Sequence, residues 1–255
     1  IHRRLWSRLF TDEAVRRGEA DRLKQLAGQT DHESLRDQIR QCVAHLHWLD
    51  GNDSAAMAEL SALGNQAPGH LAVYWETLCN TGSWERFKAW FSFALPQLQR
   101  ADGDTFRRAL DAVRTCRDAT GDEAFLRRTL TELLPRSAQA LAAFLVETGQ
   151  LEEWAYFHLL NGTPVDRLDR DQRLFVERTA PQLMLPLYHQ GMERLIAARN
   201  RTAYRDIARL AKRLQTLYRT LGEEHKFRSF LEQLYARNGR QHALMEELQK
   251  GNLFA

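Results

Sequence analysis

The feature that most constrains this chain is a glycine that recurs about every 34 residues between stretches typical of amphipathic helices. The six glycines stand at positions 51, 82, 121, 149, 191 and 222, at intervals of 31, 39, 28, 42 and 31 residues. A proline follows the helical stretch after four of these turns, at positions 68, 96, 135 and 164. Glycine tolerates the left-handed backbone that ends a helix, and proline cannot continue one. The pattern therefore predicts a series of antiparallel helical pairs.

A single helical pair cannot bury its apolar face alone, so successive pairs stack on one another. We therefore predict an all-α protein, an α-solenoid of irregular helical hairpins. The strong helix formers Leu, Ala, Arg, Glu and Gln dominate the composition. No run of alternating Val, Ile and Thr indicates a strand. The alternative is a compact bundle in which the turn glycines coincide by chance.

The clearest helix is expected over residues 202–221, where apolar residues recur at alternating steps of four and three. Gly222 ends this helix and Glu223-Glu224 begin the next. The apolar stripe consists of Ala203, Ile207, Leu210, Leu214, Leu217 and Leu221, widened by Tyr204, Ala211 and Tyr218.

Aromatic residues follow several of the turns, and we expect most of them in the core, because aromatics at helical spacing are usually buried. The alternative is that they line a groove for a peptide. They include Trp84, Phe87, Trp90, Phe91, Phe125, Trp154, Phe157, Phe227 and Phe230.

We predict one continuous helical-repeat domain over residues 1–255, with a sub-boundary near 161–168, where Asn161-Gly-Thr-Pro164 is the strongest break. The sequence begins at Ile1 without an initiator Met, so we expect a fragment of a longer polypeptide, with no signal peptide at its start. Three widely spaced cysteines favour a reducing compartment, hence the cytoplasm. The apolar runs are too short to cross a membrane.

The sequence offers no catalytic, cofactor-binding or metal-binding motif, and we predict a protein that is not an enzyme. Cys42, His45 and His47 form the densest cluster of metal-ligand residue types. On a helix, however, His47 points about 160° away from Cys42, and no second ligand pair follows at zinc-like spacing. We therefore expect no metal and no cofactor.

The C-terminal third is basic, with 13 Lys/Arg against 7 Asp/Glu between His189 and Lys250. Such a segment can attract an anionic partner, although an ordinary solvated helix face is the simpler interpretation. The candidate anionic-partner surface consists of Arg194, Arg199, Arg201, Arg205, Arg209, Lys212, Arg213 and Arg219.

Two segments resemble known families. Leu49-Asp-Gly51 through Pro68 is similar to a tetratricopeptide (TPR) half-repeat, with Ala56 and Leu60 at its packing positions. The final third, Tyr188 to Leu248, resembles the C-terminal helical region of bacterial SWIM zinc-finger family proteins. The match includes Ile196-Ala-Ala-Arg-Asn-Arg201, Leu217-Tyr-Arg-Thr-Leu-Gly222 and Phe230-Leu-Glu-Gln-Leu-Tyr235.

The zinc motif of the SWIM family, Cys-x-Cys followed by Cys-x-His, is absent from this sequence. The resemblance implies that such a module would precede Ile1. The family's nucleic-acid or protein-binding roles attach mainly to that module, so they assign no role to a residue here.

These observations predict a non-catalytic helical-repeat scaffold or protein-interaction module, because stacked hairpins form surfaces that bind peptides or partner domains. The alternative is a nucleic-acid-binding accessory module that uses the basic C-terminal third. No membrane association is expected.

Overall fold

The computed structural model describes residues 11–63, 68–251 and 253. These residues form fourteen α-helices and two short 3-10 helices, with no strand among them, which confirms the all-α helical-repeat prediction. The chain divides into two compact units, Ile1–Ser137 (unit 1) and Ala138–Ala255 (unit 2). The expected sub-boundary at 161–168 lies inside unit 2. The prediction of one continuous domain stays a prediction.

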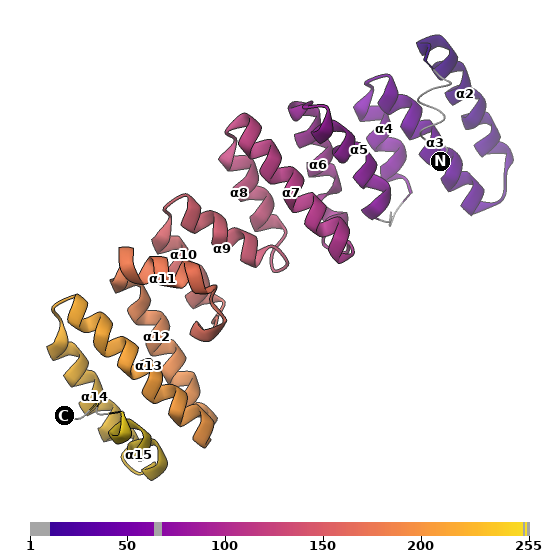
Figure 1. The fold of residues 1–255 in the computed structure, drawn as a ribbon. Helices are drawn as coiled ribbons and strands as arrows, with labels where there is room; N and C mark the ends of the chain where they lie inside the picture. The colour runs from indigo at the N-terminus through magenta and orange to yellow at the C-terminus, as the bar shows by residue number, and fades with distance from the viewer. Residues whose placement is uncertain (1–10, 64–67, 252, 254–255) are drawn as a thin grey trace. The chain divides into compact units, whose positions relative to one another are not determined.

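Unit 1 is a series of hairpins that follow one another in chain order (Figure 1). Helix α3 packs against α2 and α4, α5 packs against α6 and α7, and α6 packs against α8. Its helices are α2 (Glu13–Gln29), α3 (Glu33–Leu49), α4 (Asp53–Ser61), α5 (Pro68–Asn80), α6 (Trp84–Leu98), α7 (Gly103–Thr120) and α8 (Glu123–Glu132).

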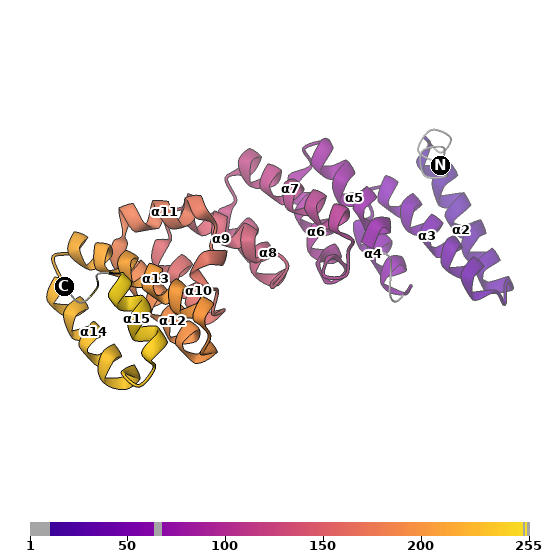
Figure 2. The same ribbon diagram turned by 60° about the horizontal axis from the view of Figure 1, so that its bottom comes forward.

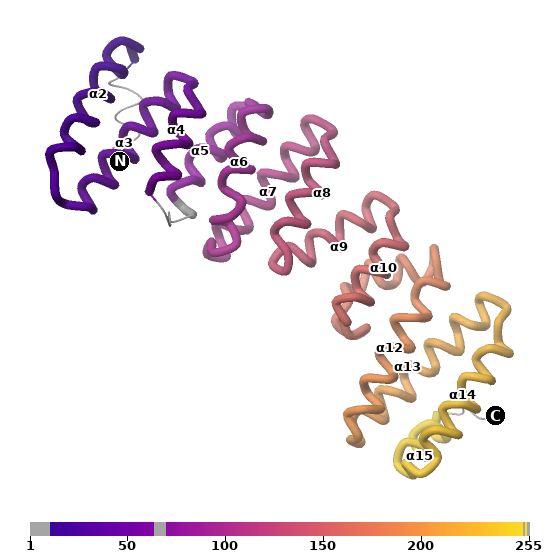
Figure 3. Tube along the Cα trace, turned by 180° about the vertical axis from the view of Figure 1, so that it is seen from behind, coloured from indigo at the N-terminus to yellow at the C-terminus, as the bar shows by residue number. Residues whose placement is uncertain are grey.

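Unit 2 is built around α13, which packs against α12 on one side and against α14 and α15 on the other (Figures 2 and 3). Its elements are α9 (Ala138–Glu147), α10 (Leu151–Leu160), η1 (Val165–Arg167), α11 (Arg170–Thr179), η2 (Pro181–Leu183), α12 (Met184–Ala198), α13 (Arg201–Thr220), α14 (Glu224–Asn238) and α15 (His242–Lys250). The helix expected over 202–221 is therefore confirmed as α13.

Five of the six expected turn glycines have the left-handed backbone that the pattern predicts. The φ angles are +74° at Gly51, +68° at Gly82, +72° at Gly121, +73° at Gly149 and +70° at Gly222. The prolines are less regular as helix ends, because Pro68 begins α5 and Pro96 lies inside the last turn of α6.

The prediction of a turn at Gly191 is wrong, because this glycine lies in the middle of α12. A Cβ atom there would lie 3.4 Å from Val165 Cγ2 and 3.5 Å from Leu210 Cδ1. The small residue thus allows α12 to approach η1 and α13 closely. Gly162, with φ +56°, holds the left-handed turn after α10 instead.

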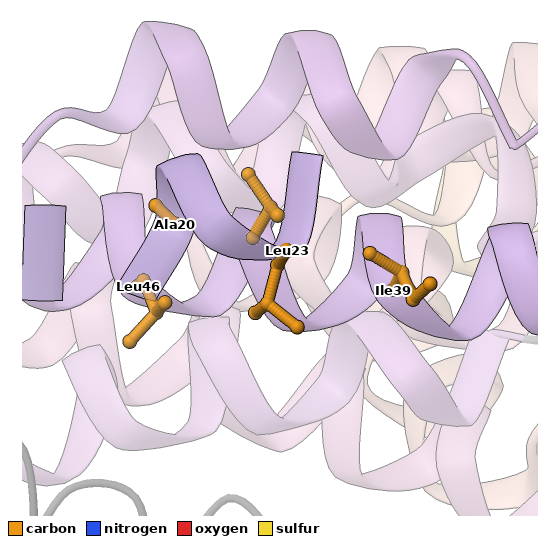
Figure 4. Close-up of a cluster of buried hydrophobic side chains, with 5 residues drawn as sticks. Ala20, Leu23, Ile39 and Leu46 are labelled. Atoms are coloured by element: carbon orange, nitrogen blue, oxygen red, sulfur yellow. The ribbon is translucent and has the colours of Figure 1, made fainter. Parts of the chain in front are cut away.

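The cores of both units are formed by the apolar faces that the helical spacing predicts. In unit 1, Ala20 and Leu23 of α2 pack against Ile39, Val43 and Leu46 of α3 (Figure 4). In unit 2, the apolar stripe of α13 is buried or partly buried throughout. Ala56 and Leu60, the packing positions of the TPR-like segment, are also buried.

The aromatic residues after the turns belong mainly to the core, as expected. Phe87, Trp90, Phe91 and Trp154 are each at most 1% exposed, which excludes them from any open groove. Tyr74 of α5 stacks on Trp90 of α6 with ring centroids 4.5 Å apart, so aromatic packing holds this hairpin together.

Arginine side chains connect successive hairpins of unit 1 by binding the carbonyls at helix ends. Arg86 Nη2 of α6 donates to the carbonyl of Trp48, 3.2 Å away in the last turn of α3. The same guanidinium donates to both carboxylate oxygens of Asp53, at 2.8 and 2.6 Å. Arg136 Nη1 donates to the carbonyl of Leu98, the last residue of α6, at 2.9 Å. Each contact satisfies an acceptor that lacks an intrahelical partner.

We predict that Gly121→Ala lowers the free energy of unfolding by about 1 kcal/mol, because Ala pays a steric cost at a positive φ. A Cβ at Gly121 meets no atom within 4 Å, so the cost comes from the backbone alone. The matched control is Gly103→Ala at the other end of α7, which also has open space and lacks a positive φ. Chemical denaturation should show a loss only for Gly121→Ala, and equal losses would contradict this account.

Candidate functional site

The eight basic residues singled out in the sequence lie in or next to α12 and α13, and all eight side chains are exposed. Helix α13 alone carries six Lys/Arg and one acidic residue, Asp206. Its apolar stripe faces the core of unit 2, so its cations project from the opposite face. The structure distinguishes four groups among these residues.

Arg194 caps a helix, which sequence reasoning missed. Its guanidinium donates a hydrogen bond to the carbonyl of Gly162, directly after α10. Gln190, four residues earlier in α12, donates to the carbonyl of Leu159 at 3.1 Å. Arg194 therefore holds the end of α10 against α12 and contributes less to an open cationic surface than expected.

Two cations of α13 have carboxylate partners. Arg209 Nη2 lies 3.0 Å from Asp206 Oδ1, and Arg201 Nε lies 3.9 Å from Glu247 Oε1 of α15. Both arginine side chains are about two-thirds exposed, so each ion pair is worth about 0.2–1 kcal/mol. The pKa of Glu247 is lowered chiefly by the hydrogen bond from Lys250, with smaller effects from the nearby cations.

Arg213 lies toward a polar network that joins α11 to α12. The hydroxyl of Tyr188 donates to Glu177 Oε1. Burial, followed by the hydrogen bond and the charge of Glu177, raises the pKa of Tyr188, and the charges of Arg173 and Arg213 oppose this shift. Arg213 is therefore close enough to act on this hydroxyl.

Arg205, Lys212 and Arg219 remain, and they form a line along α13. They are seven residues apart, so on an α-helix they drift by only about 20° per step and lie about 10.5 Å apart. None of the three has an ion pair with a described residue. Arg199, at the C-cap of α12, is exposed at φ +48° beyond the start of this line.

The tyrosines of α13 are part of the core and do not face the cations. Tyr204 and Tyr218 are each 8% exposed. The hydroxyl of Tyr204 donates to Gln241 Oε1 at 2.9 Å, and that of Tyr218 lies 2.9 Å from His189 Nε2. Neither ring is available to stack on a ligand at the outer face.

A second surface, which sequence reasoning did not single out, lies on α10. Leu160 and Tyr156 are 70% and 63% exposed, the highest values among the large hydrophobic side chains of the described residues. Glu152, Tyr156 and Leu160 are spaced by four and therefore share one face of the helix. That spacing was the available signal. We call Glu152, Tyr156 and Leu160 the α10 surface.

The opposite face of α10 is anchored in unit 2. Trp154 is fully buried and its Nε1 donates to Gln172 Oε1 at 3.0 Å. His158 packs edge-on against Trp154, and its Nδ1 lies 3.1 Å from Thr163 Oγ1. Burial lowers the pKa of His158 to about 4. These contacts fix the orientation in which Tyr156 and Leu160 point outward.

Cys42, His45 and His47 are all in α3 and have different surroundings. His45 is buried and stacks on Trp48 with ring centroids 5.7 Å apart. His47 Nε2 lies 3.3 Å from Lys24 Nζ, and burial followed by the charge of Lys24 lowers its pKa. The described part of the chain contains no group of three or more His, Cys, Asp or Glu side chains placed to hold a metal ion.

Comparison with known proteins adds one relative. The uncharacterized protein YwqB of Bacillus subtilis (strain 168) is 24% identical over 262 residues, which cover 98% of this chain and 47% of that protein. The chain thus spans about half the length of the curated relative that it matches. No family model and no solved structure matches the chain. None of the described helices has the length and apolar character needed to cross a bilayer.

We predict that stability falls as the pH drops from 6.5 to about 4, in part because of His158. Below pH 6.5 the unfolded state binds a proton on this ring, whereas the folded state does so only near pH 4, so acid favours unfolding. His158→Phe keeps a ring against Trp154 and removes the proton. Denaturation at a series of pH values should show a shallower decline for this variant, and an unchanged decline would exclude His158 as a source.

Proposed function

We propose that this chain is a non-catalytic helical-repeat module that binds a partner protein through the α10 surface. The observation that carries the proposal is the exposure of Tyr156 and Leu160 on a helix whose other face is fixed by Trp154 and His158. Exposed apolar side chains on a rigid element are the usual anchors of protein interfaces.

The α10 surface also indicates the chemistry of the partner. Glu152 is exposed in the first turn of α10, four residues before Tyr156. A complementary segment presents apolar side chains to Tyr156 and Leu160 and a Lys or Arg to Glu152. We therefore propose a basic amphipathic segment of another protein as the occupant.

The expected affinity of such a segment for this surface is modest. Burying two large apolar side chains contributes about 3–6 kcal/mol. Association itself costs about 4–15 kcal/mol in lost translational and rotational freedom. One α10 surface alone therefore supports weak binding, and tight binding requires further contacts or several linked segments.

A peptide-display selection on the chain tests this proposal. We predict that recovered peptides carry apolar residues flanked by Lys or Arg, and that Tyr156→Ala with Leu160→Ala weakens their binding at least tenfold, because both anchors are lost. Tyr235→Ala on α14 is the control, since Tyr235 is 54% exposed and lies outside the α10 surface. Peptides that bind the double variant as well as the original chain would contradict the proposal.

We also propose that the chain is the C-terminal helical region of a SWIM zinc-finger-type protein located in the cytoplasm. The resemblance of Tyr188–Leu248 supports the family relationship, and the sparse cysteines support the location. We expect the complete reading frame to encode Cys-x-Cys and Cys-x-His upstream of Ile1. Sequencing that frame tests the relationship, and a complete frame without the motif would exclude it.

A further inference from the structure

We infer that the outer face of α13 binds the phosphate backbone of duplex nucleic acid. This interaction is separate from the α10 surface and does not depend on the protein-binding role proposed above. We define the α13 face as the three cations without an ion pair, Arg205, Lys212 and Arg219, together with Arg201 and Arg209, whose carboxylate partners are weakly held.

The absence of an exposed apolar anchor on α13 argues against a protein as the occupant of this face. The large apolar side chains of α13 are buried or partly buried. Five exposed ion pairs to an acidic protein would contribute about 1–5 kcal/mol in total, which does not exceed the cost of association. A cationic line without apolar contacts is therefore poorly suited to a protein interface.

A nucleic-acid backbone can be held by cations alone, because each neutralised phosphate releases condensed counterions. The line from Arg205 to Arg219 covers 14 residues, about 21 Å of helix. A duplex presents one charge per about 1.7 Å of its axis, so each of these cations can reach a phosphate. Charge density on the ligand, which exceeds that of an acidic peptide, thus compensates for the missing apolar contact.

The tyrosines of α13 favour a duplex over a single strand. Proteins that bind single strands gain about 1–3 kcal/mol per base by stacking on aromatic rings. Tyr204 and Tyr218 cannot provide such stacking, because both rings are buried and both hydroxyls have partners in the core. The α13 face therefore offers charge without base stacking, and the ligand with the higher charge density binds better.

The two carboxylates beside the α13 face weaken its charge. Asp206 partners Arg209, and Glu247 lies beside Arg201 and Arg205. The exposed arginines can exchange these weak partners for phosphates only in part. Removing the two negative charges should therefore strengthen binding, which a merely solvated helix face would not show.

The test measures binding of the chain to a short mixed-sequence DNA duplex and to one of its single strands, between about 50 and about 200 mM salt. With three phosphates neutralised, the plot of log K against log salt should have a slope of about −2.7 for the duplex, a loss of about 40-fold over this range. For the single strand we expect weaker binding and a slope of about −2.1.

Two variants and a control make the test specific. Arg205→Gln with Lys212→Gln and Arg219→Gln should abolish duplex binding. Asp206→Asn with Glu247→Gln should tighten it and steepen the slope toward about −4.5, as two further arginines become available. The control, Arg114→Gln with Arg167→Gln and Arg170→Gln, removes three exposed cations located elsewhere and should leave binding largely intact.

Several outcomes would overturn the inference. Equal losses in the triple variant and the control would mean that only net charge matters. Tighter binding to the single strand, or to polyglutamate, would identify a different class of partner for this face. No gain on removal of Asp206 and Glu247 charges would place the bound phosphates away from α13. None of these outcomes bears on peptides bound at the α10 surface.

Discussion

The carbonyls left without partners at helix C-termini are the constraint on which this structure depends. A chain of short helices has many such ends, and each buried acceptor must be satisfied. Here the acceptors are satisfied from the neighbouring hairpin: Arg86 binds the carbonyl of Trp48 and Arg136 that of Leu98 in unit 1, and Arg194 binds that of Gly162 in unit 2. The same contacts that close one helix therefore also hold the next hairpin in place.

The arginines that make these contacts explain why a basic sequence does not produce a uniformly basic surface. Arg194 is used as a cap, Arg213 faces a polar network, and Arg201 and Arg209 have carboxylate partners. What remains on α13 is a narrow line of three cations on a helix with a fully apolar inner face. Function on this surface depends on those few positions more than on net charge.

Local patterns allowed the helices and most of the turns to be predicted from the sequence. The stripe of α13 and the left-handed glycines at 51, 82, 121, 149 and 222 follow from spacing and backbone preference alone. Gly191 was misread because a glycine also serves close helix packing, and only the positions of Val165 and Leu210 reveal that use. Arg194 was misassigned for the same reason, since its acceptor lies 32 residues away. The α10 surface was overlooked because burial of aromatics is the rule, and Tyr156 is an exception.

The separations of the arginine–carbonyl contacts also bear on how the protein acquires its structure. The three pairs join residues that are 38, 38 and 32 positions apart. Contacts of short sequence separation form quickly, because little loop-closure entropy opposes them. A nascent chain can therefore complete each pair soon after its second member leaves the ribosome, while the segments that follow have not yet been translated.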